Sequence, residues 1–302
     1  MTEMRFRSTK GVVVLAIVCG TLLFVAATYS HCPAPELQGY GGGSDLPIIY
    51  AVTPTYARPV QKAELTRLSH VIRLAPNVHW IIVEDANSPS SVVANLLRRS
   101  GLGGRSTALF AKTPEQFKLK GKDPNWVKPR GVEQRNVALE WIRENATKER
   151  QSIVYFMDDD NTYSLELFAE MSRIQPGKVG VWPVGLVGGL MVEKPLLDDH
   201  NKVTGFNSAW RPERPFPIDM AGFAISTNLL LQRREAVFTY DVQRGYQESE
   251  ILRHLTTVQE LQPMANLCRD VLVWHTRTEK PKLVEEDKLL KKGQKSDDGM
   301  EV

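Results

Sequence analysis

The chain has 302 residues, with 38 Lys and Arg against 35 Asp and Glu, so its formal net charge is +3 at pH 7. This near balance gives no reason to expect a nucleic-acid partner, which a strong excess of basic residues would attract. Only three cysteines are present, which excludes a small fold held together by several disulfides.

The N-terminus predicts a membrane anchor. Residues 1–10 are a basic cytoplasmic tail, and residues 11–29 contain no charged side chain. A helix of that length reaches about 28 Å, enough for the hydrocarbon core of a bilayer. The basic flank should remain cytoplasmic, which would place the rest of the chain in the lumen. The alternative is a cleaved signal peptide, because Ala26 and Ala27 resemble a cleavage site.

Residues 30–46 are rich in proline and glycine and are expected to form a flexible stem. The stem holds Cys32, which in an oxidising compartment could form a disulfide with the same residue of a second chain. The alternatives are an unpaired thiol and a link to Cys268. Asn145 begins the sequon Asn-Ala-Thr, so it is a candidate for N-glycosylation in a lumenal protein.

Residues 47–302 are long enough for a large core and are expected to alternate between strands and helices. In chain order the expected elements are a strand at 47–52, a helix at 65–75, a strand at 78–83, helices at 90–99 and 132–143, and a strand at 153–157. This order predicts an α/β fold with a mainly parallel, twisted sheet.

Polar clusters follow the expected strands at 53–56, 84–85 and 158–160. Parallel strands bring their carboxyl ends to one edge, where ligands bind in open α/β sheets. The last cluster is three consecutive aspartates, and carboxylate oxygens suit Mg²⁺ or Mn²⁺ held together with substrate phosphates. The sequence therefore predicts a divalent metal and a phosphate-bearing substrate. The simpler alternative is a solvated acidic turn.

Seven ordered blocks of the sequence resemble the animal β-1,3-glucuronosyltransferases: residues 53–58, 83–85, 129–136, 158–164, 182–190, 214–224 and 274–281. They span nearly all of residues 46–282. The resemblance implies a GT-A type glycosyltransferase fold with a mixed central sheet, in which residues 47–160 form a Rossmann-like half that binds the UDP-sugar and residues 161–302 bind the acceptor. It also implies a homodimeric, single-pass type II protein of the Golgi membrane.

The implied reaction is the transfer of glucuronate from UDP-glucuronate to the 3-OH of a terminal β-galactose, with inversion and with Mn²⁺. The block Arg-Pro-Phe-Pro at 214–217 is most similar to the family member that acts on the proteoglycan linker, Gal-β1,3-Gal-β1,4-Xyl on the core protein. N-acetyllactosamine-type acceptors on glycoproteins or glycolipids are the alternative. Where the family would have an amide side chain that reaches into the partner's acceptor site, this chain has Glu285.

The resemblance also implies roles for individual residues. Asp160 matches the metal ligand. The residues that match the sugar-nucleotide site are Pro54, Thr55, Tyr56, Asp85, Arg130, Arg135, Asp158, Asp159, Arg244, His275 and Arg277. The residues that match the acceptor site are Glu193, Trp210, Arg214 and Asp219. Alone, Arg130 and Arg135 are more often surface salt-bridge residues. The alternative for His275 is a strand-end histidine bonded to backbone, and the alternative for Trp210 is a loop anchor.

Glu248 is the candidate general base. The apolar residues Ile251, Leu252 and Leu255 mark one face of the expected helix, and Glu248 shares that inward face. A carboxylate pushed against an apolar wall has a raised pKa, which makes it a better base. The alternative is an acid that stabilises the first turn of the helix through its dipole.

Two other classes of protein have to be weighed. A non-catalytic lumenal galactoside-binding protein on the same fold should have lost the aspartates or Glu248, and this chain keeps both. A metal-dependent phosphotransferase should show a second metal cluster or a Walker-type glycine loop, and neither is present in the sequence. The charged segment 282–302 is expected to be a solvated arm or, alternatively, a segment exchanged between the chains of a dimer.

Overall fold

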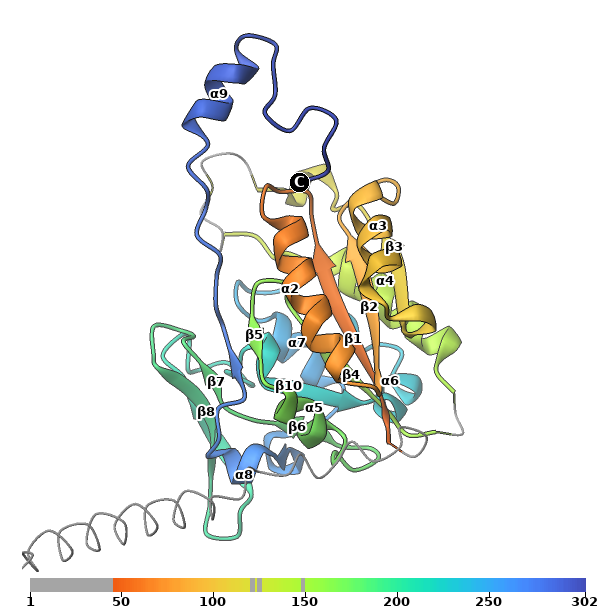
Figure 1. The fold of residues 1–302 in the computed structure, drawn as a ribbon. Helices are drawn as coiled ribbons and strands as arrows, with labels where there is room; N and C mark the ends of the chain where they lie inside the picture. Colours follow the sequence, from red (N-terminus) through yellow and green to blue (C-terminus); the bar gives the residue numbers. More distant parts are fainter. Residues whose placement is uncertain (1–45, 120–122, 124–126, 148–149) are drawn as a thin grey trace, which may run out of the picture. The chain divides into compact units, whose positions relative to one another are not determined.

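Seven strands form one mixed sheet in the computed structural model, which describes residues 46–119, 123, 127–147 and 150–302 (Figure 1). The strand order is β11-β6-β10-β4-β1-β2-β3. Four of the strands run parallel to one another: β1 (Ile48–Thr55), β2 (Val78–Glu84), β3 (Ser106–Phe110) and β4 (Ser152–Phe156). The prediction of a mainly parallel α/β arrangement is confirmed for this half of the sheet.

Three strands beyond β4 make the sheet mixed: β6 (Val179–Val181), β10 (Phe223–Ser226) and β11 (Gln262–Pro263). Strand β10 runs antiparallel to both β4 and β6, and β11 runs parallel to β6. The sheet therefore takes strands from both sides of residue 160, so the segments expected to bind the donor and the acceptor share one core.

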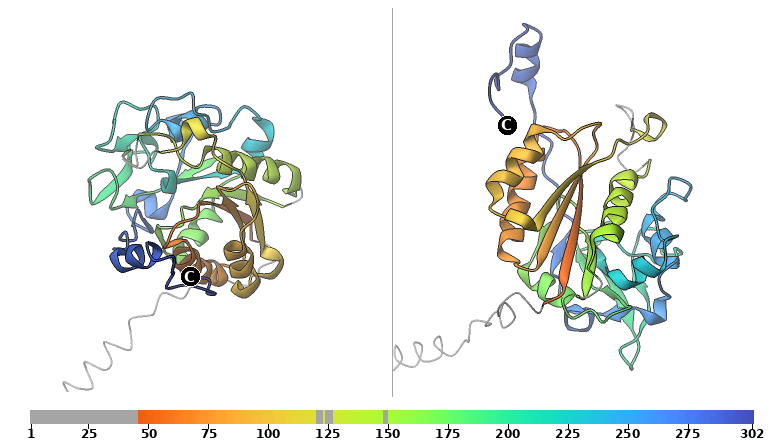
Figure 2. Two further views of the ribbon diagram at one scale, coloured as in Figure 1. Left: turned by 90° about the horizontal axis from the view of Figure 1, so that it is seen from above. Right: turned by 90° about the vertical axis from the view of Figure 1, so that its right-hand side faces the viewer.

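The predicted helices are confirmed, and they cover both faces of the sheet (Figure 2). They are α2 (Gln61–Leu74), α3 (Ser91–Ser100) and α4 (Val132–Asn145). Side chains of β1 alternate between the two faces, since Ile49 and Ala51 pack with α2 and α3, while Tyr50 and Val52 pack with α4. This alternation is what a strand buried on both faces requires.

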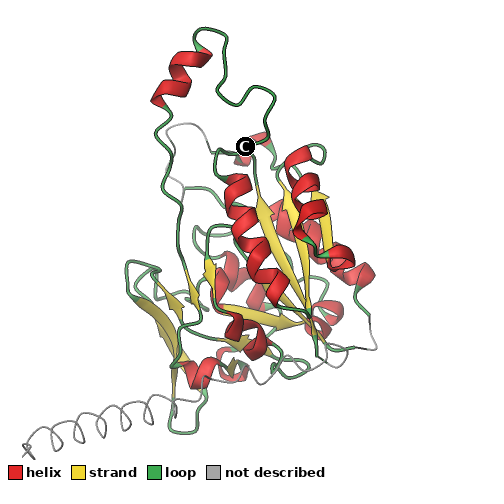
Figure 3. Ribbon diagram, viewed as in Figure 1, coloured by secondary structure: helices red, strands yellow, loops and turns green. Residues whose placement is uncertain are grey.

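A second sheet lies beside the first, in the order β5-β12-β7-β8-β9 (Figure 3). Its strands are β5 (Thr162–Tyr163), β7 (Val184–Gly185), β8 (Val192–Leu197), β9 (Val203–Asn207) and β12 (Val273–Trp274). The remaining α-helices are α5 (Leu165–Met171), α6 (Thr227–Gln232), α7 (Gln247–Arg253), α8 (Ala265–Cys268) and α9 (Val284–Leu290). Among these helices, the sequence predicted α7.

Strands β1, β2 and β4 end on one edge of the first sheet, as predicted from their parallel order. One boundary differs from expectation. The strand was expected to stop at residue 52, whereas Thr53, Pro54 and Thr55 still pair with β2. Thr53 also accepts a hydrogen bond from the indole Nε1 of Trp80 at 2.8 Å, so this polar residue belongs to the strand rather than to the turn.

The predicted anchor at 11–29 and the stem with Cys32 lie outside the described residues. Within the described ranges, no helix is both long and apolar enough to cross a membrane. Asn145 is exposed at the end of α4, whereas Cys268 is buried. Helix α9 extends away from the two sheets (Figure 1), and none of its residues is buried.

Candidate active site

The three aspartates follow β4 directly, and each has a different environment. Asp158 forms an ion pair with Nη2 of Arg135 at 3.0 Å. Asp159 is 7% exposed, and its Oδ2 accepts a hydrogen bond from Thr55 Oγ1 at 2.7 Å and an ion pair from Arg58 Nη2 at 2.7 Å. Among the residues that the structure describes, no side chain donates a hydrogen bond to the carboxylate of Asp160.

The pKa of Asp160 is raised to about 6, mainly by burial and then by the neighbouring charges of Asp158 and Asp159. Like charges disfavour ionisation, so this position is one where a cation would be stabilised. The described residues hold no group of three His, Cys, Asp or Glu side chains that could enclose a metal ion by itself. The donor set therefore fits a hard divalent cation bound by one carboxylate and completed by water and phosphate oxygens.

Tyr56 and Asp85 lie at the ends of β1 and β2. Tyr56 is 47% exposed, and the guanidinium of Arg58 lies 4.6 Å from the centroid of its ring. Both carboxylate oxygens of Asp85 accept hydrogen bonds from Thr113, one from its backbone N–H and one from its hydroxyl, at 2.8 Å each. Asp85 is thus held in a fixed orientation, and each oxygen keeps a lone pair for a further donor.

Arg135 is oriented by the turn before α4. Its Nη1 donates to the carbonyl oxygen of Arg130 at 2.8 Å, while the side chain of Arg130 lies at the exposed surface. Gly131 between them has φ +72°, and a Cβ there would lie 2.6 Å from Nη1 of Arg135. A glycine is needed at this position for both reasons.

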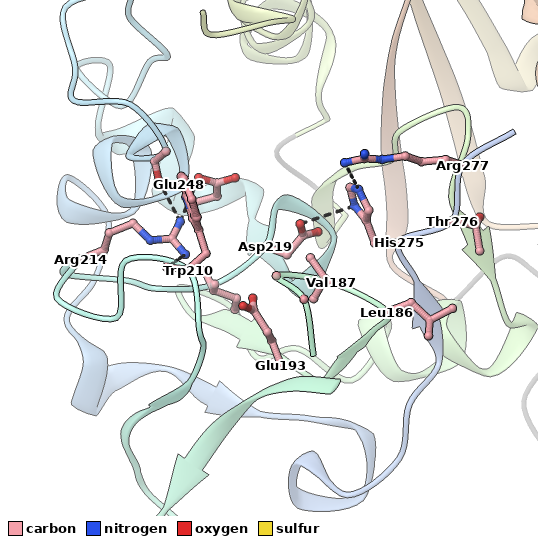
Figure 4. A pocket seen from close by; sticks show the side chains of 14 residues that line it. Leu186, Val187, Glu193, Trp210, Arg214, Asp219, Glu248, His275, Thr276 and Arg277 are labelled. Atoms are coloured by element: carbon pink, nitrogen blue, oxygen red, sulfur yellow. Dashed lines mark hydrogen bonds and ion pairs between the residues drawn. The ribbon is translucent and has the colours of Figure 1, made fainter. Parts of the chain in front are cut away.

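A cleft of about 700 Å³ lies next to the aspartates (Figure 4). Seven of the residues singled out in the sequence line it: Glu193, Trp210, Arg214, Asp219, Glu248, His275 and Arg277. Figure 4 shows Glu248, Arg214 and Trp210 on one side of the cleft, His275 and Arg277 on the other, and Asp219 between them. Arg244 lies close by, because its guanidinium is 5.0 Å from the ring of Trp210.

Glu248, at the start of α7, is a buried acid of the cleft. Its pKa is raised to about 7, mainly by burial, while the charge of Arg214 lowers it and the charge of Asp219 raises it. Nη1 of Arg214 lies 3.7 Å from Oε2 of Glu248 and also donates to the carbonyl oxygen of Gly245 at 2.8 Å. A carboxyl group with this pKa can accept a proton near neutral pH.

Asp219 and Glu193 are further acids with raised pKa values in the same cleft, and burial is the main cause for both. Oδ1 of Asp219 accepts from the backbone N–H of Ala221 at 2.9 Å, and its Oδ2 lies 3.6 Å from Nδ1 of His275. Oε1 of Glu193 accepts from the hydroxyl of Ser208 at 2.8 Å. Each acid is therefore held on one side and directed into the cleft on the other.

Pairing within the second sheet connects the aspartates to the cleft. Strand β5 follows Asp160 almost directly, and β12 pairs antiparallel with it. The residues after β12 are His275 and Thr276, and the hydroxyl of Thr276 donates to the carbonyl oxygen of Asp160 at 2.7 Å. His275 and Arg277 contact each other at 3.3 Å between Nε2 and Nη2.

Three residues contact the site although the sequence did not predict them there: Arg58, Thr113 and Thr276. Arg58 and Thr276 lie inside two of the blocks that carried the family resemblance, so their presence in those blocks was the available signal. Thr113 lies in no block, and only the pairing of β2 with β3 brings its loop beside Asp85.

Comparison with known proteins identifies the family. The model of glycosyltransferase family 43 matches residues 68–279. The chain belongs to glycosyltransferase family 43. A Drosophila melanogaster relative named galactosylgalactosylxylosylprotein 3-beta-glucuronosyltransferase I is 64% identical over 306 residues, covering 100% of both chains. The resemblance seen in the sequence is thereby confirmed.

Two further relatives carry the same enzyme name. Galactosylgalactosylxylosylprotein 3-beta-glucuronosyltransferase 3 of Mus musculus is 52% identical over 267 residues, which are 85% of this chain and 78% of the relative. A Caenorhabditis elegans relative is 49% identical over 249 residues, which are 82% of this chain and 69% of the relative. The similarity to family 43 proteins therefore covers the whole site described above.

Replacing Asp160 by Asn should stabilise this family 43 chain in the absence of divalent metal. Because the pKa of Asp160 is raised in the folded chain, this carboxyl group destabilises the fold progressively from about pH 4, where it ionises in the unfolded chain, and fully above about pH 6. After allowance for partial exposure we expect a gain of about 1–2 kcal/mol at pH 7 and almost none near pH 4. Urea unfolding at the two pH values measures the gain.

The matched control is Asp158→Asn, which removes the partner of a largely buried arginine and should destabilise the chain. Addition of Mn²⁺ should stabilise the wild-type chain and have little effect on Asp160→Asn. A loss of stability for Asp160→Asn at pH 7 without metal would contradict the interpretation of Asp160 as an uncompensated charge.

Proposed function

We propose that this chain transfers glucuronate from UDP-α-glucuronate to the 3-OH of a terminal β-galactose of the proteoglycan linker, Gal-β1,3-Gal-β1,4-Xyl on a core protein. The arrangement of titratable and charged side chains on the two opposite sides of the cleft supports this proposal most directly. A carboxyl group with a pKa of about 7, Glu248, faces the side that carries His275, Arg277 and the aspartates. The names of the family 43 relatives support the substrate class.

The donor would lie along the ends of β1, β2 and β4, as expected for a GT-A type fold. The exposed ring of Tyr56 offers a stacking surface for the uracil. The carboxylate of Asp85 offers a hydrogen-bond acceptor to the N–H of the uracil. Arg244, His275 and Arg277 supply positive or hydrogen-bonding groups for the diphosphate and for the carboxylate of glucuronate. A donor with a neutral sugar would lack the carboxylate that these groups would contact, which disfavours it.

Asp160 would hold the divalent cation, for which we propose Mn²⁺. When bound, this ion supplies positive charge that stabilises the departing diphosphate. Asp158 and Asp159, with their arginine partners, fix the backbone that carries Asp160. Thr276 donates a hydrogen bond to the carbonyl oxygen of Asp160. This bond connects the residue that would bind the metal to the segment that carries His275 and Arg277.

Glu248 would act as general base. Its carboxylate accepts the proton of the galactose 3-OH, and the hydroxyl oxygen forms a bond to C1 of glucuronate on the face opposite UDP. The bond from C1 to the β-phosphate oxygen breaks, and its electron pair leaves with UDP. One displacement of this kind turns an α-linked donor into a β-linked product and requires no protein nucleophile.

The acceptor would occupy the half of the cleft around Trp210. This indole is 41% exposed, with Arg244 beside its ring, and it offers an apolar face to a galactose ring. Glu193 and Asp219 provide directed acceptors for sugar hydroxyl groups. Arg214 lines the same cleft, where its donors bind Glu248 and backbone carbonyl oxygens, and its contact with the acceptor stays a prediction.

A homodimer anchored in the Golgi membrane is the proposed assembly, with residues 11–29 as the anchor, the body in the lumen, and Asn145 and Cys32 available for glycosylation and crosslinking. Helix α9 supports the dimer, because Leu283, Val284 and Leu290 are 44%, 60% and 48% exposed. Glu285 on the same helix pairs only with its neighbour Lys288, at 2.6 Å, within the described chain. These exposed apolar side chains fit a surface that a second copy covers.

Glu248→Gln should lower kcat by about 10²- to 10⁴-fold, the usual contribution of a general base, while UDP binding stays unchanged. For the wild-type chain, kcat/KM should fall about tenfold per pH unit below pH 7, because protonated Glu248 cannot accept a proton. The control is Glu250→Gln on the same helix, whose carboxylate pairs with Arg253 outside the cleft. Near-normal turnover by Glu248→Gln would remove Glu248 from the mechanism.

An acceptor panel tests the proposed substrate. Radiolabelled UDP-glucuronate is supplied with either Gal-Gal-Xyl or Gal-GlcNAc, and we expect Gal-Gal-Xyl to be the better acceptor by at least about tenfold in kcat/KM, the difference expected when a polar contact is missing. Preference for Gal-GlcNAc would favour the N-acetyllactosamine alternative. Acceptor binding with no transfer to either sugar, with Mn²⁺ present, would favour a non-catalytic galactoside-binding protein.

Replacing Leu283, Val284 and Leu290 together by Gln should convert the dimer into a monomer, since the exposed apolar contacts of α9 would be lost. Analytical ultracentrifugation of the full chain measures the change. Lys292→Gln, an exposed change just after the same helix, is the control and should leave the dimer intact. A wild-type chain that sediments as a monomer would refute the proposed assembly.

A further inference from the structure

Arg58 lies between Tyr56, which would contact the base of the donor, and the aspartates, which lie where its diphosphate would bind. It comes three residues after β1, and its backbone carbonyl oxygen accepts from the N–H of Gln61 at 3.0 Å, at the start of α2. Its side chain is 13% exposed. A long basic side chain so well covered, and paired with two acids, has a fixed conformation rather than a solvated one.

One half of the Arg58 guanidinium binds acids. Nη2 forms ion pairs with Asp159 and with Glu64, a residue of α2 that is only 3% exposed. The same Oδ2 of Asp159 also accepts from Thr55 Oγ1. Asp159 therefore directs this oxygen into the protein, and its carboxylate connects the end of β4 to the end of β1 and to α2.

The other half of the guanidinium supports Tyr56. Nη1 donates to the carbonyl oxygen of Tyr56 at 3.1 Å and lies 3.4 Å from Thr55 Oγ1. The guanidinium carbon lies 4.6 Å from the centroid of the Tyr56 ring, within the range of a cation–π contact. Arg58 thus occupies one face of the ring, while the ring as a whole remains 47% exposed.

We propose that Arg58 is a positioning residue for the sugar nucleotide. Its single guanidinium holds the ring of Tyr56 and the carboxylate of Asp159 in a fixed relation, so the surface for the base and the anchor of the aspartate triplet keep the separation that the donor requires. This inference rests on the proposed function, because it takes UDP as the ligand that spans the two groups.

A purely electrostatic role is the rival interpretation of the same contacts. Loss of Arg58 would leave Asp159 and Glu64 without their partner in a largely buried place, which by itself destabilises a fold. The two roles can be separated, because Glu64 contributes charge to the cluster but contacts neither Tyr56 nor Asp159 in the described chain. Removal of the Glu64 charge should relieve the electrostatic cost and leave the positioning defect.

The experiment compares four variants of the full chain: Arg58→Met, Arg58→Lys, Arg58→Met with Glu64→Gln, and Glu64→Gln alone. Calorimetry with UDP and Mn²⁺ gives the affinity, and thermal unfolding gives the stability. Arg73→Met is the control, since Arg73 lies exposed in the last turn of α2, the helix that also carries Glu64. UDP binding by the wild-type chain is measured first, and its absence would count against the proposed function rather than against the role of Arg58.

We expect Arg58→Met to weaken UDP binding by at least about tenfold, because both the stacking support and the ion pair are lost. Arg58→Lys should be intermediate, since a single ammonium group cannot bind the acids and support the ring together. The double variant should regain stability relative to Arg58→Met while UDP binding stays weak. In steady-state kinetics the KM for the donor should rise and the KM for the acceptor should not.

A double variant that binds UDP within about twofold of Glu64→Gln alone, a difference too small for a lost ion pair, would overturn the proposal and leave Arg58 with a charge-balancing role. An equal rise in the KM of donor and acceptor would also contradict it, because a general loosening of the site would then explain the defect. Arg73→Met should bind UDP as the wild-type chain does.

Discussion

At the end of β4 three carboxylates follow one another, and two of them have an arginine partner. Arg135 pairs with Asp158, and Arg58 pairs with Asp159, so the negative charge that remains is concentrated on Asp160. Burial and its neighbours keep the pKa of that carboxyl raised. The fold bears this cost at one position, which is the usual way in which a binding site is maintained at the expense of stability.

The acidic strand end becomes part of a larger site through the second sheet. Because β5 follows the aspartates and β12 pairs with it, His275 and Thr276 lie beside Asp160 although more than a hundred residues separate them in the chain. From there the cleft extends to Glu248. In the proposed reaction, the side with His275, Arg277 and Asp160 would face the leaving group, and the side with Glu248 would face the incoming hydroxyl.

Glu248 shows how the environment can shift the pKa of one carboxyl group toward the value that a general base needs. Its burial against the apolar side of α7 raises the pKa, and Asp219 acts in the same direction, while Arg214 limits the rise. The result is a group that is partly ionised near neutral pH. Arg214 also binds backbone carbonyl oxygens, so the residue that limits the pKa also fixes the loop around Trp210.

The sequence was sufficient to predict strands β1, β2 and β4 and helices α2, α3 and α4, because buried strands and amphipathic helices leave short-range patterns. It also identified the aspartates and Glu248, whose residue types are tied to their chemistry. The tertiary structure showed which aspartate has no arginine partner within the described residues, and that Thr113 orients Asp85. It also placed Arg58 against both Tyr56 and Asp159. Those facts depend on contacts between residues distant in the chain, which strand pairing creates and no local pattern records.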